Sequence, residues 1–185
     1  MKRIFLGTIT ALTASCMLLA SAYAGWSPKE KDQPTSAQEV DDTIVQFLQS
    51  DKGLQEFFDN AHGYAVFPKV YKGAWGVGAA YGSGRVYETG KHIGDSKLYQ
   101  LTLGFQAGAQ AYSELIFFGE KAALDRFIRQ KAEFSAQVSA VAATTGASAD
   151  ADYSNGVAVF TLALGGLMYE ASVGGQTFEF TPVAE

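Results

Sequence analysis

The segment 71–84 constrains the fold most, because bulky and very small residues alternate along it. One set of alternating positions is mostly bulky and consists of Tyr71, Trp75, Val77, Ala79 and Tyr81. The other set is nearly bare and consists of Lys72, Ala74, Gly76, Gly78 and Ala80. A period of two predicts a β-strand, whose bare face another segment can approach closely. We expect Gly82-Ser83-Gly84 to form a hairpin turn and residues 85–88 to be the returning strand.

The rest of the chain divides into helical and strand-like stretches. Apolar residues recur at helical spacing over 37–49, 52–61 and 120–130, and Ser36 with Glu39 has the spacing of a capping box. Strands are predicted at 64–67 (ended by Pro68), 98–112, 113–118, 134–141, 157–164, 167–173 and 177–180. This order predicts an α+β fold, with a curved antiparallel β-sheet or a partly closed barrel, two N-terminal helices and one inserted helix.

The first residues predict export from the cytoplasm. A basic start at Lys2 and Arg3 precedes an apolar stretch, and Ala22-Tyr23-Ala24 has the small-x-small pattern of a cleavage site. We therefore expect a signal peptide at 1–24, a flexible lead at 25–35 and a single domain at 36–185, in a periplasmic or secreted protein. The one cysteine, Cys16, leaves a lipoprotein as the alternative.

The sequence offers little for catalysis. Gly76-Val77-Gly78 resembles the beginning of a dinucleotide fingerprint, but that motif must open a helix and this segment alternates as a strand. The two histidines, His62 and His92, have no partner at metal-ligand spacing. We expect no enzyme activity, no catalytic residue, no cofactor, no metal and no nucleic-acid partner. A small outer-membrane barrel is a further alternative, disfavoured because the amphipathic helices need a core to cover.

Charge is unevenly distributed along the chain. Residues 63–110 carry five basic and two acidic side chains, a net charge of +3, whereas 25–62 and 111–185 each carry a net charge of −5. Lys and Arg form charge-assisted hydrogen bonds with phosphate oxygens, so this basic segment is a candidate site for lipid headgroups. Ordinary solvated surface is the alternative. The candidate contacts are Lys69, Lys72, Arg85, Lys91 and Lys97.

Four blocks of sequence, taken in order, resemble the SYLF domain family. They lie at 61–68 (Ala-His-Gly-Tyr-Ala-Val-Phe-Pro), 72–84 (Lys-Gly-Ala-Trp-Gly-Val-Gly, closing at Gly-Ser-Gly), 103–118 and 166–176. The resemblance covers about residues 37–180 and implies a lipid-binding module. Eukaryotic members are associated with phosphoinositides and actin, but this chain resembles a secreted bacterial member, for which actin is not an expected partner. It departs from the family at 89–96, where many members carry Trp-Ser-Pro.

Two functions are compatible with these observations. The first is a secreted, non-enzymatic lipid-binding module that binds phospholipid headgroups at the cell envelope through its basic segment. The alternative is a structural or interaction protein of the envelope, which binds another protein or a second copy of itself. The two differ in salt dependence, because headgroup binding through lysines weakens as salt rises whereas an apolar interface does not.

Overall fold

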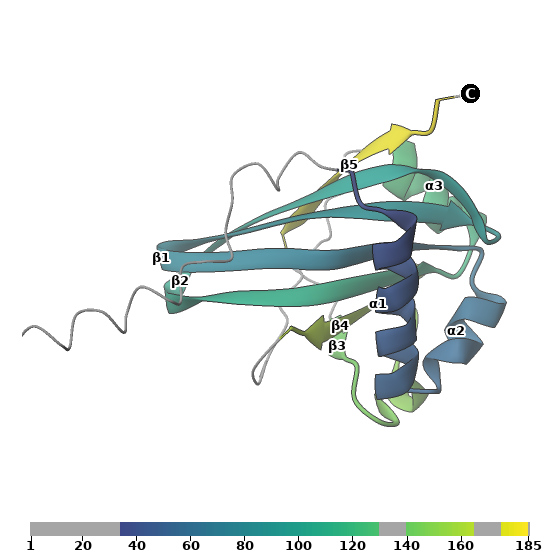
Figure 1. Ribbon diagram of the computed structural model, residues 1–185, viewed down its shortest axis with the longest axis horizontal. Helices are drawn as coiled ribbons and strands as arrows, with labels where there is room; N and C mark the ends of the chain where they lie inside the picture. The colour runs from purple at the N-terminus through teal and green to yellow at the C-terminus, as the bar shows by residue number, and fades with distance from the viewer. Residues whose placement is uncertain (1–33, 130–139, 165–174, 185) are drawn as a thin grey trace, which may run out of the picture. The chain divides into compact units, whose positions relative to one another are not determined.

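The computed structural model describes residues 34–129, 140–164 and 175–184, all of which belong to one compact unit, Pro34–Glu185 (Figure 1). The predicted signal peptide, most of the lead, the strand at 167–173 and most of the strand at 134–141 lie outside these residues. Among the described residues, no helix combines the length and the apolar character that crossing a bilayer requires.

Three helices form where helical periodicity predicts them: α1 (Ala37–Ser50), α2 (Leu54–Asn60) and α3 (Lys121–Arg129). The predicted capping box is confirmed, because the Glu39 N–H donates to Ser36 Oγ and the Ser36 N–H donates to Glu39 Oε2. The Ser36 N–H also lowers the pKa of the Glu39 carboxyl. Asp51 ends α1, and its carboxylate accepts the N–H groups of Gly53 and Ser148, which ties the α1–α2 junction to η3 (Ala147–Asp150).

Two long strands, β1 (Gly63–Glu88) and β2 (Lys91–Phe118), form an antiparallel hairpin. The turn predicted at Gly82-Ser83-Gly84 is wrong, because β1 continues through it and the chain turns at Thr89 and Gly90, with φ of 48° and 80°. Residues 85–88 are therefore the end of β1 and not a returning strand.

The strand predicted to end at Pro68 also continues. The register with β2 shifts between Phe67 and Val70, so Pro68 sits in a bulge, where its missing N–H breaks no ladder hydrogen bond. Its carbonyl accepts a hydrogen bond from Ser113 Oγ at 2.8 Å. The stretches 98–112 and 113–118 were predicted as two strands, but both belong to β2, which runs without a break to Phe118.

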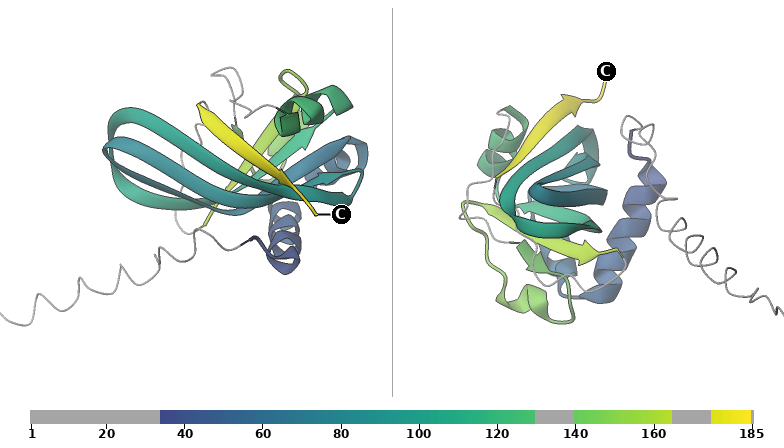
Figure 2. Two further views of the ribbon diagram at one scale, coloured as in Figure 1. Left: turned by 90° about the horizontal axis from the view of Figure 1, so that it is seen from above. Right: turned by 90° about the vertical axis from the view of Figure 1, so that its left-hand side faces the viewer.

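The hairpin doubles back on itself (Figure 2). A straight strand of 26 residues would be about 85 Å long, so β1 must bend to remain within one domain. An ideal Cβ on Gly84 would lie 2.4 Å from the Val66 carbonyl oxygen, and one on Gly63 would lie 2.6 Å from that of Tyr87. The first and last thirds of β1 thus lie against each other, and the absence of side chains at these glycines permits the contact.

Three shorter strands complete the sheet: β3 (Ala140–Ala142), β4 (Val157–Ala163) and β5 (Gln176–Pro182). The order is β1-β2-β4-β3, and β5 pairs with the first part of β2. The β3–β4 pair is parallel, which departs from the purely antiparallel expectation. Residues 143–156 form the crossover connection that a parallel pair requires. The α+β class and the curved sheet are confirmed, and the described strands leave the sheet open, since β1 and β3 end the order.

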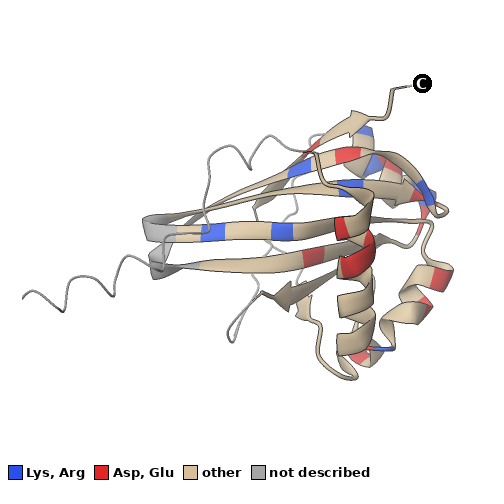
Figure 3. Cartoon of the chain, in the orientation of Figure 1, with Lys and Arg blue, Asp and Glu red and all other residues tan. Residues whose placement is uncertain are grey.

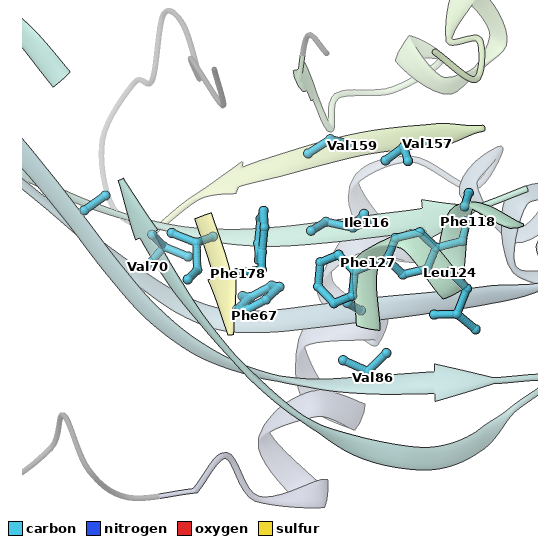
Figure 4. Close-up of a cluster of buried hydrophobic side chains, with 14 of the residues drawn as sticks. Phe67, Val70, Val86, Ile116, Phe118, Leu124, Phe127, Val157, Val159 and Phe178 are labelled. Carbon is cyan, nitrogen blue, oxygen red and sulfur yellow. The ribbon is translucent and has the colours of Figure 1, made fainter. Parts of the chain in front are cut away.

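Two apolar clusters hold the elements together. The inner core lies within the curve of the hairpin, where α3, β4 and β5 contribute side chains such as Phe127, Val159 and Phe178 (Figure 4). The outer core lies under α1 and α2, where Phe47 and Leu54 pack on the other face of the sheet. α1 and α3 therefore lie on opposite sides of the sheet (Figure 2).

Candidate functional site

Arg85, one of the five predicted basic contacts, has a structural role. Its Nε donates to the Thr35 carbonyl oxygen at 2.7 Å and lies 3.9 Å from Asp95 Oδ1 on the neighbouring strand. Its side chain is half-buried, and it attaches the segment that precedes α1 to the hairpin.

The four lysines are distributed along the hairpin. Lys91 is exposed beside the Thr89–Gly90 turn, and Lys97 is exposed on β2, opposite Ser83 of β1 and Glu179 of β5. Lys69 is exposed in the first part of β1. Lys72 is half-buried opposite Gln110, on the strand face that also carries Val70 of the inner core.

Two of these lysines, Lys69 and Lys97, lie near each other on the folded hairpin. An ideal Cβ on Gly82 would lie 3.0 Å from the Lys69 carbonyl oxygen, so Lys69 lies beside the last part of β1. Lys97 is opposite Ser83, the next residue. Lys69 and Lys97 are therefore about two strand spacings, or roughly 10 Å, apart along the backbone. The structure brings these two together and leaves Lys91 at the far turn.

Apolar side chains lie on the outer face of the hairpin beside Lys97. Tyr81 is opposite Tyr99 and their ring centroids are 5.4 Å apart, while Ala79 is opposite Leu101. Leu101 is 76% exposed and Tyr99 is 37% exposed. The other strand face, with Ala80 and Leu98, is buried. We call the set Ala79, Tyr81, Tyr99 and Leu101 the hairpin patch.

The hairpin patch was not among the predicted site residues, although its signal is present in the sequence. Strand alternation puts Tyr81 on the bulky face of β1, and puts Tyr99 and Leu101 on one face of β2. Periodicity identifies the two faces but does not say which one is buried. The close approach occurs at Gly82 and Gly84, which were predicted to form a turn, and it leaves the bulky face outside.

Acidic residues are concentrated elsewhere. Figure 3 shows Asp and Glu on α1 and α2, and Lys and Arg mainly along the hairpin strands. The helical side of the molecule carries Glu39, Asp41 and Asp42 on exposed positions of α1. This side would repel an anionic surface, whereas the hairpin would not.

A polar cluster is buried within the curve of the hairpin, next to the inner core. Gln176 Nε2 donates to Glu114 Oε2 at 2.8 Å and is 3.5 Å from the Tyr112 hydroxyl. Glu114 lies opposite Thr161 in the β2–β4 register. Burial raises the pKa of Glu114 to about 8, partly offset by the Gln176 bond, so the carboxyl is mostly protonated at pH 7.

Both histidines lie near the hairpin turn and pair with carboxylates. His62 Nε2 is 2.9 Å from Glu88 Oε1, and His92 Nε2 is 3.0 Å from Asp95 Oδ1. The His62–Glu88 pair joins the residue before β1 to the last residue of β1, where the Thr89 N–H also donates to the His62 carbonyl oxygen at 3.0 Å. Within 34–129, 140–164 and 175–184, His, Cys, Asp and Glu form no group of three or more that could hold a metal ion.

Two comparisons with known proteins give a match. A family model described as "Ysc84: Las17-binding protein actin regulator" matches residues 99–181, which include the buried polar cluster, Tyr99 and Leu101 but none of the five basic candidates. "Beta cell expansion factor A" of Aeromonas veronii is 28% identical over 144 residues, which are 75% of this chain and 53% of that protein. The chain therefore spans about half the length of this relative. Both matches agree with the resemblance of the four sequence blocks, so the chain is similar to the SYLF (Ysc84) domain family.

Proposed function

We propose that this protein is a non-enzymatic, peripheral phospholipid-binding module of the cell envelope, and that it contacts the membrane through the hairpin patch, with Lys69 and Lys97 beside it. The observation that carries the proposal is the exposure of Leu101, at 76%, beside the exposed ring of Tyr99. Contiguous exposed apolar side chains next to basic ones are typical of surfaces that bind a membrane interface. The envelope location depends on the predicted signal peptide at 1–24, outside the described residues.

The side chains of this surface suit reversible binding. Fully burying a leucine side chain contributes about 1.5–3 kcal/mol, and a lysine near an anionic membrane contributes about 1 kcal/mol. Tyrosine rings are suited to the boundary between acyl chains and headgroups. Lys97 faces Glu179 across the β2–β5 pair, and Lys69 is one of the groups that lower the pKa of Glu39, so each lysine contributes less than one without an acidic neighbour.

Vesicle flotation tests the proposal. The full chain is mixed at low salt with vesicles of phosphatidylglycerol and phosphatidylethanolamine, or of phosphatidylcholine alone. We expect binding to the anionic vesicles, weakened about tenfold or more by Leu101→Asn. The matched control is Val45→Asn, because Val45 is also an exposed apolar residue, at 51%, but lies on the acidic helix α1.

The lysine contribution is tested separately. The double variant Lys69→Gln, Lys97→Gln should bind anionic vesicles on the order of tenfold more weakly and lose most of its salt dependence. If Val45→Asn abolishes binding and Leu101→Asn does not, the contact lies on α1. If the wild-type protein floats with neither vesicle at low salt, the lipid-binding function is rejected.

A protein partner or a second copy of the chain is the competing function, and it would use the same apolar surface. Sedimentation velocity separates the two. A dimer that forms with rising concentration, disappears in Leu101→Asn and persists in Val45→Asn, without any vesicle binding, would support the interaction protein instead.

A further inference from the structure

The polar cluster inside the hairpin has oxygen atoms that the surrounding residues leave without partners. Among the described residues, Glu114 Oε1, Gln176 Oε1 and Thr161 Oγ1 are buried and receive no hydrogen bond. Glu114 and Gln176 are each fully buried, and Thr161 is 1% exposed. Leaving a buried polar atom without a partner is costly, so three in one place indicate that something else occupies the site.

The described residues also leave the charge in this cluster unbalanced. In the described ranges, Glu114 forms no ion pair, and the facing residues are uncharged: Phe67 of β1, Thr161 of β4 and Gln176 of β5. Tyr112 is the other titratable group, and burial raises its pKa far above neutral pH. A buried carboxylate is tolerated only if a proton or a counter-cation neutralises it.

We propose that this cluster of Glu114, Gln176 and Thr161 binds one monovalent inorganic cation, sodium or potassium. The available ligands are a carboxylate oxygen, an amide oxygen and a hydroxyl oxygen, which are the hard donors that such ions prefer. The single carboxylate balances a single positive charge. A divalent ion would leave one uncompensated charge in the interior, where that is costly.

The cation and the Glu114 proton compete for the same carboxylate. Binding should therefore be weak at pH 6, where the carboxyl holds its proton, and strong at pH 9, where it is ionised. A surface salt effect would involve the exposed acids of α1 and α2, and keeping the ionic strength constant removes it.

Thermal unfolding of the full chain at constant ionic strength tests the inference. Tetramethylammonium chloride, whose cation is too large for the site, is replaced stepwise by sodium or potassium chloride. At pH 9 we expect a saturable rise in Tm of about 3–6 °C at ten times the dissociation constant, and a much smaller rise at pH 6. Glu114→Gln should lose the rise, whereas Glu56→Gln, an exposed carboxylate of α2, and Lys72→Gln should retain it.

Direct binding keeps the inference testable if Glu114→Gln does not fold. Equilibrium dialysis of the wild-type chain at pH 9 against rubidium, a potassium analogue, should give one ion per chain, displaced by potassium. If the site is selective for sodium, rubidium will not bind. We then expect the sodium-23 NMR line to broaden and the effect to saturate at one ion per chain. Two results would overturn the inference. One is equal Tm values in all three chlorides with no ion bound by either method, and the other is an undiminished rise in Tm in Glu114→Gln.

Discussion

Replacing Glu114 by Gln should remove a fall in stability that the wild-type protein shows between about pH 5 and pH 8. The folded state raises the pKa of this carboxyl from 4.5 to about 8, mainly through burial. Between these values the folded protein holds one proton more than the unfolded chain. The free energy of unfolding must therefore decrease as pH rises, by up to about 1.4 kcal/mol per pH unit.

The magnitude is bounded by the two pKa values. Each tenfold change in proton affinity corresponds to about 1.4 kcal/mol, so the wild-type protein should lose at most about 5 kcal/mol from pH 4.5 to pH 8 and little more above pH 8. Glutamine has the same shape and no charge, so the variant should be flat over this window. Glu39, Asp51 and Asp125 have lowered pKa values, and their contributions are lost only as pH falls below about 5.

Urea unfolding followed by circular dichroism measures the effect. The titrations are made from pH 5 to pH 9 in tetramethylammonium buffers free of sodium and potassium, with Glu56→Gln as the control for loss of an exposed carboxylate. We expect the stability curves of wild type and Glu114→Gln to diverge steadily with pH, while Glu56→Gln follows wild type. Parallel curves for wild type and Glu114→Gln would show that burial does not keep this carboxyl protonated, and the reasoning would fail.

Three further substitutions test the contacts that shape the fold. Gly84→Ala should lower the free energy of unfolding by about 1–3 kcal/mol, because the new Cβ meets the backbone of the first part of β1. Gly73→Ala is the control and should have little effect in the same urea titration, because a Cβ there has nothing within 4 Å. Asp51→Ala should cost about 1–3 kcal/mol by leaving the buried Ser148 N–H and the part-buried Gly53 N–H without this acceptor, and unchanged stability would exclude that role. Arg85→Met should raise hydrogen exchange in the first turn of α1 by releasing the Thr35 carbonyl, with unchanged exchange as the contrary result.

The helices could be predicted because their signals are local. The capping box of Ser36 and Glu39 involves residues three apart, and the apolar stripe of α3 fixes the buried positions Ala123, Leu124 and Phe127. Both patterns act through contacts within a few residues, so tertiary packing reinforces them without changing their position.

The hairpin turn could not be predicted because its glycines serve a distant contact. Gly82-Ser83-Gly84 has the composition of a turn, but the absent side chains at Gly82 and Gly84 make room for residues 66–70. Thr89-Gly90 gives a weaker local signal, yet both residues adopt the positive φ that a two-residue hairpin turn requires. Only the three-dimensional path of β1 distinguishes these two uses of glycine.

The basic residues illustrate a second limit of sequence. Net charge over 63–110 is a sum, and it does not say that Arg85 is already bound to Thr35 or that Lys91 lies at the far turn. Charge counting overstated the number of lysines and arginines available at one surface. It also missed Leu101, whose exposure depends on which face of β2 the fold buries.

Gly82 and Gly84 affect the hairpin patch indirectly, because they allow β1 to double back. They are not themselves ligand contacts. The strand can fold against itself only where its inner face is nearly bare, and burying that face leaves Tyr81, Tyr99 and Leu101 outside. A side chain at Gly84 would therefore separate the two parts of β1 and disturb the patch at a distance. Loss of vesicle binding in Gly84→Ala would not identify Gly84 as a lipid contact, whereas loss in Leu101→Asn at unchanged stability would identify Leu101 as one, because that side chain points away from both cores.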